Sequence, residues 1–333
     1  MKVKTICAIS FLLLSLSAAL AQRGAADNEI VKPRDYVAPK FSTSTQLQLI
    51  LEGAVADMLS KYSGGTFKPT EVAATLIDLR DPERPKIASV NGNTRFYPAS
   101  VVKMFFMAAL ERQIEDGKIK VTPELERGLK DMIVVSSNDA TQYIVDVLTD
   151  TSSGPELPAR EFAEWQYKRN RVNRFFESMG YTNINVNQKT FCEDAYGVEQ
   201  QSRNYRGENR NALTTDATAR LLAEIAMRRF ISTARSEAML QLMKRDPYTP
   251  SNDPDDQSVG FTGKAFIDNK VAGVKLWSKA GWTSKSRHDA AYVETPDGLK
   301  FVLVVFTENH ANDREPIPTI AFSVLKGLRE SYK

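Results

Sequence analysis

Ser100 and Lys103 stand three residues apart, after a Tyr-Pro-Ala sequence and at the start of an apolar stretch. In a helix this spacing places both side chains on one face, close enough to share a proton. A serine hydroxyl is a weak nucleophile at neutral pH, and a lysine can serve as its base if burial and a nearby positive charge lower the lysine pKa. Unpaired N–H groups at a helix start also stabilise developing negative charge. The pair therefore predicts an acyl-transfer site with Ser100 as the nucleophile.

Two further short motifs follow along the chain, Ser-Ser-Asn at 136–138 and Lys-Ala-Gly at 279–281. Each motif is weak alone, because a second Ser-x-x-Lys occurs at 323–326 and Ser-x-Asn recurs at 89–91 and 202–204. Lys-x-Gly occurs once. The three motifs come in order, at a predicted helix start, a helix junction and a strand end, which indicates one shared catalytic site.

This ordered set resembles the motifs of the penicillin-recognising serine enzymes, and the chain is most similar to their class A β-lactamases. The similarity extends from about Ser44 to the C-terminus. It includes Arg-Phe-Tyr-Pro-Ala-Ser at 95–100, the run 132–138, Asp-Ala-Ala-Tyr-Val at 289–293 and the apolar segment 301–307. The resemblance implies a two-lobed fold with one α/β lobe and one all-α lobe.

The resemblance also implies a role for each motif residue. Ser100 would be the acylated nucleophile, and Lys103 the base or proton relay beside it. Ser136 would pass a proton to the leaving nitrogen, and Asn138 would bind a carbonyl of the substrate side chain. Lys279 would attract the substrate carboxylate with its positive charge and help to lower the pKa of Lys103.

The backbone N–H groups of Ser100 and Trp282 would form the oxyanion hole, with Gly281 beside them. Two positions depart from the class A pattern. Ser137 stands where aspartate is usual, and Ala280 replaces a hydroxyl residue that normally meets the substrate carboxylate. Losing that hydrogen bond would cost about 1.5–3 kcal/mol. Arg287 lies near enough along the next strand to compensate, although it could equally be a surface arginine.

The carboxylate that activates water for deacylation is harder to locate. Class A enzymes carry it in a Glu-x-x-Leu-Asn pattern, in the loop before the helix that here is predicted near Thr215. The corresponding loop contains Glu193, Glu199 and Glu208, and none of them is followed by Leu-Asn. Counting back from the helix favours Glu199, with Asn204 as its partner. A solvated loop acid remains the alternative for each glutamate.

Hydrophobic periodicity predicts the elements that would position these residues. The expected fold is α+β. One lobe, residues 44–97 and 255–333, would contain a five-stranded antiparallel sheet flanked by the terminal helices, and residues 98–254 would form an all-α lobe. The ligand cleft is expected between the two lobes. The predicted helices are 45–62, 101–114, 125–134, 141–148, 161–179, 216–227 and 319–329; the predicted strands are 72–79, 87–90, 271–277, 290–294 and 301–307.

The N-terminus predicts export. Residues 1–21 combine lysines, a short apolar run and an Ala-Leu-Ala end, which is typical of a cleaved signal peptide, and 22–43 are expected to be a flexible leader. Cleavage would lower the formal net charge from +3 to +1, which gives no reason to expect nucleic acid binding. It would also leave Cys192 as the sole cysteine. With two histidines in the chain, a His/Cys metal site is not expected, and both histidines are expected at the surface.

These features favour an exported, periplasmic or secreted, serine hydrolase that opens the β-lactam amide through a Ser100 acyl-enzyme. The first alternative is a D-alanyl-D-alanine peptidase that acts on cell-wall peptides, and the second is a penicillin-binding sensor that stays acylated. The expected partner is a small β-lactam or a peptidoglycan peptide. We expect no cofactor, no stable membrane anchor and a monomer.

Overall fold

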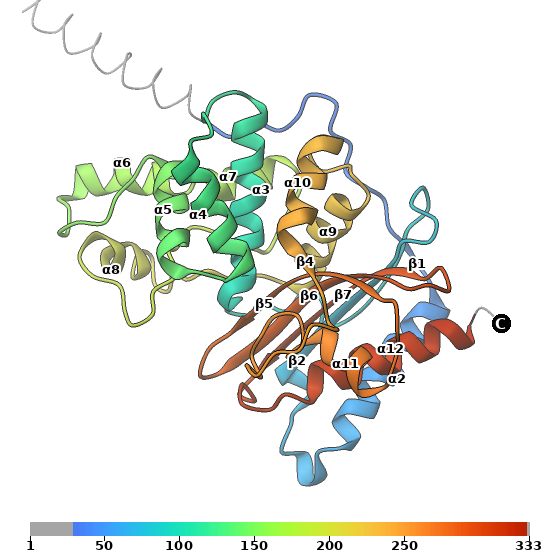
Figure 1. Ribbon diagram of the computed structural model, residues 1–333. Coiled ribbons are helices and arrows are strands. Elements are labelled where there is room, and N and C mark those ends of the chain that lie inside the picture. The colour runs from blue at the N-terminus through green and yellow to red at the C-terminus, as the bar shows by residue number, and fades with distance from the viewer. Residues whose placement is uncertain (1–28, 332–333) are drawn as a thin grey trace, which may run out of the picture.

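A mixed sheet forms the centre of the molecule, which the computed structural model describes for residues 29–331 (Figure 1). The strand order is β1-β3-β2-β7-β6-β5-β4, and the five strands from β3 to β5 pair antiparallel, which confirms the predicted α+β fold. The short edge strands β1, which is parallel to β3, and β4 were not predicted. The strands are β1 Ser42–Thr43, β2 Val72–Asp78, β3 Lys86–Val90, β4 Lys244–Arg245, β5 Lys275–Trp282, β6 Ser286–Glu294 and β7 Lys300–Glu308.

Strand β5 starts later than the sequence pattern predicts, at Lys275 rather than residue 271. Lys270 and Gly273 have φ angles of 54° and 74°, so the chain turns through this segment in the left-handed region and cannot form a strand there. The strand then continues to Trp282. The Lys-Ala-Gly motif at 279–281 therefore lies within the strand, where its backbone is paired with β6.

Helices near the two termini cover one face of the sheet. They are α2 Thr45–Ser60 and α12 Pro316–Glu330, and the shorter helix α11 Thr262–Asp268 packs on the same face. Ser44 caps α2, because its side chain accepts a hydrogen bond from the N–H of Leu47. Alternate strand residues such as Ala291 and Val293 point to this layer, while Ala290 and Tyr292 point to the opposite layer. Both faces of the sheet are thus buried.

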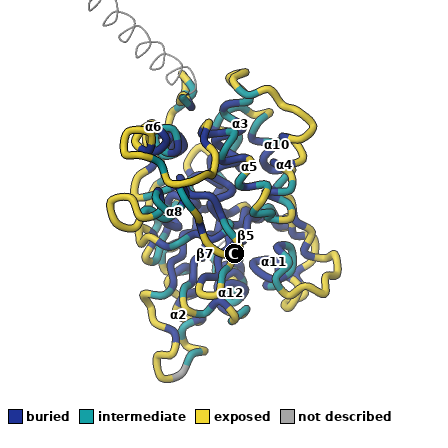
Figure 2. The backbone as a smooth tube through the Cα atoms, turned by 90° about the vertical axis from the view of Figure 1, so that its left-hand side faces the viewer, coloured by how far each residue is buried: buried dark blue, intermediate teal, exposed yellow. Residues whose placement is uncertain are grey.

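The opposite face carries the all-α lobe (Figure 1). Its helices are α3 Val102–Glu115, α4 Pro123–Val134, α5 Asn138–Thr149, α6 Ala159–Arg169, α7 Arg171–Ser178, α8 Val198–Arg203, α9 Thr215–Ala226 and α10 Thr233–Met243. The predicted helix 161–179 is two helices, because the backbone at Asn170 leaves the helical region with ψ at 10°. Helix α3 is buried from Val102 to Glu111, and Figure 2 shows most of it dark blue along with the central strands.

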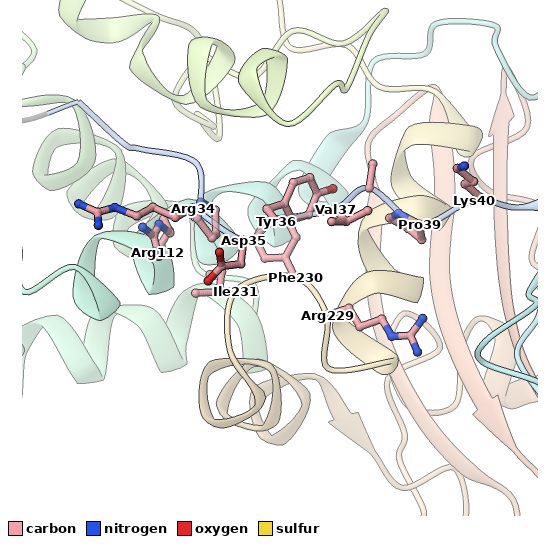
Figure 3. A pocket seen from close by; sticks show the side chains of 12 residues that line it. Arg34, Asp35, Tyr36, Val37, Pro39, Lys40, Arg112, Arg229, Phe230 and Ile231 are labelled. Carbon is pink, nitrogen blue, oxygen red and sulfur yellow. The ribbon is translucent and has the colours of Figure 1, made fainter.

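The leader is more ordered than the sequence suggests, because its described part packs along the all-α lobe. Ile30 is buried in the core of this lobe, and the Tyr36 hydroxyl donates to both oxygens of the buried Glu224 at 2.9 and 2.8 Å. The segment 33–40 also forms one wall of a pocket of about 590 Å³ with Phe230 and its neighbours (Figure 3). None of the residues predicted for catalysis lines this pocket.

The predicted signal peptide, residues 1–21, lies outside the described residues. Between residues 29 and 331, no helix has the length and apolar character needed to cross a membrane. Within the same range, no three His, Cys, Asp or Glu side chains are grouped in a way that could hold a metal ion.

Candidate active site

Ser100 lies where a short 3-10 turn, η3 (Ala99–Val101), leads into α3. The turn is fixed on one side by the backbone pairing of Phe96 with Leu213. Ala99 has a φ of 46°, a left-handed conformation that is strained for a residue with a Cβ atom and that is commonly found at functional sites. Ser100 itself is half-buried, and its hydroxyl has no hydrogen-bond partner among the described residues.

A buried histidine holds the segment that leads into this turn by a hydrogen bond to its backbone. His288 is fully buried, its Nε2 donates to the Tyr97 carbonyl at 2.9 Å, and its Nδ1 accepts the Thr307 N–H at 3.1 Å. Accepting at Nδ1 and donating at Nε2 defines a neutral ring. Burial lowers the pKa of His288 to about 4. The expectation of a surface histidine is therefore wrong at this position, because the ring fits between the sheet and the turn that carries Ser100.

Lys103 is buried in the first turn of α3, three residues after Ser100, and points to the Ser-Ser-Asn motif. Its Nζ donates to the Ser136 carbonyl at 2.5 Å, to Asn138 Oδ1 at 2.8 Å and to Ser136 Oγ at 3.3 Å. Burial lowers the pKa of Lys103 to about 7, so a large fraction of this amine is neutral near pH 7. No hydrogen bond joins Lys103 to Ser100. Catalytic hydrogen bonds often shorten only when substrate is bound, so this geometry is compatible with a base.

Ser136 links the two lysines of the site. Its backbone has a φ of 60°, and its Oγ accepts from Lys279 Nζ at 3.0 Å as well as from Lys103. The next residue, Ser137, caps α5 by accepting the Ala140 N–H at 3.1 Å. Serine and aspartate are both strong N-cap residues, which explains how Ser137 can replace the aspartate of the class A pattern.

Lys279 is fully buried on β5. Its Nζ donates to Gln257 Oε1 at 2.6 Å and to the Ala280 carbonyl at 2.7 Å, besides Ser136. Burial, followed by the charges of Lys103 and Arg245, holds the pKa of Lys279 well below its ordinary value. Gln257 was not identified from the sequence, because it lies in a loop without periodicity and belongs to none of the three motifs.

Gly281 brings β5 into direct contact with the turn at Ser100. A Cβ atom at this position would lie 2.6 Å from the Ser100 nitrogen and 2.8 Å from the Val101 nitrogen, so only glycine fits. Beyond it, Thr283 donates to the Ser286 carbonyl, and the alternation of antiparallel pairing makes Trp282 a residue of a non-hydrogen-bonded pair. Its N–H therefore points away from β6, toward the open edge of the sheet.

Asn138 opens α5 and contacts a cysteine. Its Oδ1 accepts from Lys103, and its Nδ2 donates to the sulfur of the exposed Cys192 at 3.5 Å. Cys192 was not assigned a role from the sequence, since a single cysteine in a polar loop carries no spacing signal. The structure places its thiol beside the lysine and the amide of the site.

The predicted deacylating residue Glu199 lies in a different cluster. Both of its oxygens bind Arg169, at 2.7 and 2.8 Å, and one also contacts Lys189 at 3.2 Å and Ser153 at 3.0 Å. Burial alone would raise the pKa of Glu199, but Arg169 and Lys189 overcome this effect and lower it. The carboxylate is thus held as an ion-pair partner and is not hydrogen-bonded to Lys103, Ser136 or Asn138.

The other residues of this loop do not supply the missing carboxylate. Glu193 is exposed, and Glu208 is exposed with Arg210 3.7 Å away. Asn204, the predicted partner of Glu199, is an exposed residue at the end of α8 that accepts from Gln200. The count back from α9 located a buried glutamate, but its neighbours are the cations Arg169, at the end of α6, and Lys189.

Arg287 is also engaged elsewhere. It is buried, donates to Asp255 Oδ1 and the Gly260 carbonyl, both at 2.8 Å, and covers the ring of Phe261. Ala280 is buried in the core formed with the terminal helices. Both terminal nitrogens of Arg287 thus bind Asp255 and Gly260, and no hydrogen bond joins the guanidinium to Ser100, Ser136 or Lys279. The alternative of a surface arginine is wrong, because the side chain is buried.

The two-lobed fold and the cluster of Ser100, two buried lysines and Ser136 define a serine hydrolase of the β-lactamase and penicillin-binding type. The family model described as Beta-lactamase enzyme family matches residues 51–322, and the chain belongs to this family. No curated protein matches the chain.

Solved structures show the same fold at low identity. A β-lactamase from Sphaerobacter thermophilus is 21% identical with a TM-score of 0.58, covering 84% of this chain and 96% of that chain. A β-lactamase from Xanthomonas campestris is 13% identical with a TM-score of 0.61, covering 88% and 100%. A mutant of PBP-A, seen as an acyl-enzyme complex with penicillin G, is 18% identical with a TM-score of 0.56, covering 88% and 99%.

Proposed function

We propose that the protein acylates Ser100 with β-lactams or D-alanyl peptides and hydrolyses the resulting ester slowly. The observation that carries this proposal is the contact between β5 and the Ser100 turn, with Lys103, Ser136 and Lys279 in one hydrogen-bonded chain beside it. This chain provides a base, a proton relay and a cation. The substrate would be a small amide with a neighbouring carboxylate.

In the acylation step, Ser100 Oγ attacks the amide carbonyl while its proton passes to neutral Lys103. The negative oxygen of the tetrahedral intermediate would lie between the N–H groups of Ser100 and Trp282. The C–N bond then breaks as Ser136 gives its proton to the leaving nitrogen and takes one from Lys103. The proton of Ser100 thereby reaches the nitrogen, and Lys103 is neutral again.

Hydrolysis of the ester needs a group that holds a water and takes its proton. Cys192, rather than a carboxylate, faces Lys103 and Asn138, and Glu199 is bound by Arg169 and Lys189. This arrangement favours a peptidase or penicillin-binding protein over a fast β-lactamase. The acyl-enzyme of PBP-A with penicillin G supports the idea that this fold can carry such an adduct.

Incubation with a fluorescent penicillin tests the proposal. The parent and Ser323→Ala should acquire one label that persists after excess reagent is removed, whereas Ser100→Ala should acquire none while keeping its circular dichroism spectrum. Rapid steady turnover of a chromogenic cephalosporin would contradict slow hydrolysis. Comparison with D-alanine release from a wall peptide would then identify the better substrate class.

We also propose that the protein works outside the cytoplasm, where wall peptides and β-lactams are met. The support is the signal-like sequence of residues 1–21. Expression of the full chain in a bacterial host, followed by fractionation and mass spectrometry, should yield a mature form that begins at Gln22. An intact N-terminus in the cytosolic fraction would contradict this proposal.

A further inference from the structure

Gln257 connects the two lobes at the centre of the site. It lies in the segment between β4 and α11, and its side chain is 7% exposed. Oε1 accepts from Lys279 Nζ at 2.6 Å and from the Ala280 N–H at 3.2 Å. Nε2 donates to the carbonyls of Val134 at 2.9 Å and Ile133 at 3.4 Å, at the end of the helix that leads to Ser136. The side-chain amide of Gln257 therefore fixes the position of β5 relative to the turn that carries Ser136.

The environment of Lys279 explains why such an acceptor matters. Its amine faces two basic groups, Lys103 from α3 and Arg245 from β4, and one acid, Asp289 from β6, all of them buried. Of its three oxygen acceptors, Gln257 Oε1 is the nearest. An amide oxygen that accepts from an ammonium favours its charged form.

We propose that Gln257 is a positioning residue that holds Lys279 against Ser136 and helps it to carry a positive charge. This inference rests on the proposed acylation of Ser100, in which Lys279 attracts the substrate carboxylate. Arg245 also binds the carbonyls of Ile133 and Val134, at 2.9 and 3.4 Å, so these backbone groups keep a donor when Gln257 is replaced. We therefore expect Gln257 variants to fold.

Two substitutions change the field at Lys279 in opposite directions. Gln257→Leu removes the acceptor, which should lower the pKa of Lys279 further and slow acylation by about tenfold. Gln257→Glu places a carboxylate at the same distance, which should raise that pKa by about one unit or more. If activity requires a charged Lys279, the alkaline limb of the pH–rate profile moves to lower pH in Gln257→Leu and to higher pH in Gln257→Glu.

The experiment measures the labelling rate with a fluorescent penicillin between pH 5 and pH 10, and titrates ¹³C-labelled lysine side chains by NMR, with Lys279→Arg to assign the signal. Gln166→Leu is the matched control, because Gln166 is also a buried glutamine and contacts Asn170 and Ser202. It should lower stability without moving the pH profile.

Opposite shifts of the Lys279 titration in the two Gln257 variants support the proposal. Shifts in the same direction, or no shift in either variant, overturn it and leave Gln257 with a packing role. If penicillin fails to label even the parent, the proposed function is wrong, and the NMR titration still decides whether Gln257 controls the charge of Lys279.

Discussion

Replacing Glu199 should weaken the fold instead of trapping an acyl-enzyme. The carboxylate is 1% exposed and makes two charged hydrogen bonds to Arg169 and an ion pair with Lys189. Glu199→Gln keeps the shape of the side chain and removes its charge. The two buried cations would then share only Asp146, which lies 3.6 Å from Arg169 and 2.7 Å from Lys189.

Removing one partner of a buried ion pair costs about 3–5 kcal/mol, because the other charge stays buried without compensation. Asp146 keeps part of that compensation, so we expect a loss at the lower end, about 3 kcal/mol. For a protein of this size, such a loss lowers the melting temperature by about 4–5 °C. Urea unfolding monitored by circular dichroism would measure the free energy directly.

The pH dependence of stability gives a second reading of the same interaction. Since the folded protein lowers the pKa of Glu199, its contribution is present above the ordinary glutamate value of about 4.3 and is lost as the pH falls through the folded value. The parent should therefore lose more stability on acidification than Glu199→Gln, and the difference between them should shrink at low pH.

Glu208→Gln is the matched control, because Glu208 is exposed and should change stability by less than about 0.5 kcal/mol. Labelling of Ser100 by penicillin should persist equally in the parent and in Glu199→Gln. One result would refute this reasoning: a Glu199→Gln protein with parental stability that converts fast β-lactam turnover into a trapped adduct. Glu199 would then be the base for water.

Three further predictions concern the acylation of Ser100 and the hydrolysis of the resulting ester. Lys103→Arg should reduce the rate of penicillin labelling by at least about 100-fold, because guanidinium cannot accept a proton near neutral pH, and the parental rate should rise with pH through about 7. Gly281→Ala should reduce the same rate by about 100-fold through a clash with the Ser100 nitrogen, whereas Gly53→Ala, where nothing lies within 4 Å, should not. Cys192→Glu should shorten the lifetime of the adduct, measured by intact-protein mass spectrometry, and an unchanged lifetime would place the water elsewhere.

The parts of the site that could be predicted lie on elements with a strong hydrophobic pattern. Ser100 and Lys103 open a helix in which every residue from Met104 to Leu110 is fully buried, so core packing fixes their position. Lys279 lies on β5 between Ser278 and Ala280, which are both fully buried. For these residues, motif order and periodicity pointed to the same place.

The parts that could not be predicted depend on contacts between loops. Gln257 has no partner within its own segment that a local pattern could reveal, because its bonds reach β5 and α4. The late start of β5 depends on two left-handed residues in a short turn. For Glu199, the count back from α9 led to a buried glutamate, but the cations that bind it come from residues 169 and 189, which that count could not reveal.

The loop that carries Cys192 shows how these two kinds of position are connected. Before the cysteine, Asn211 fixes the backbone by accepting from the N–H of Gln188 at 2.9 Å and donating to its carbonyl at 2.8 Å. Lys189, also before the cysteine, pairs with Glu199, which lies after it, so the segment is held on both sides of residue 192. The buried glutamate thereby anchors the loop, and the anchored loop presents the thiol to Asn138. Because the anchors are separate from the exposed side chain at 192, a change there can alter the fate of the acyl-enzyme while the fold and the acylation machinery stay in place.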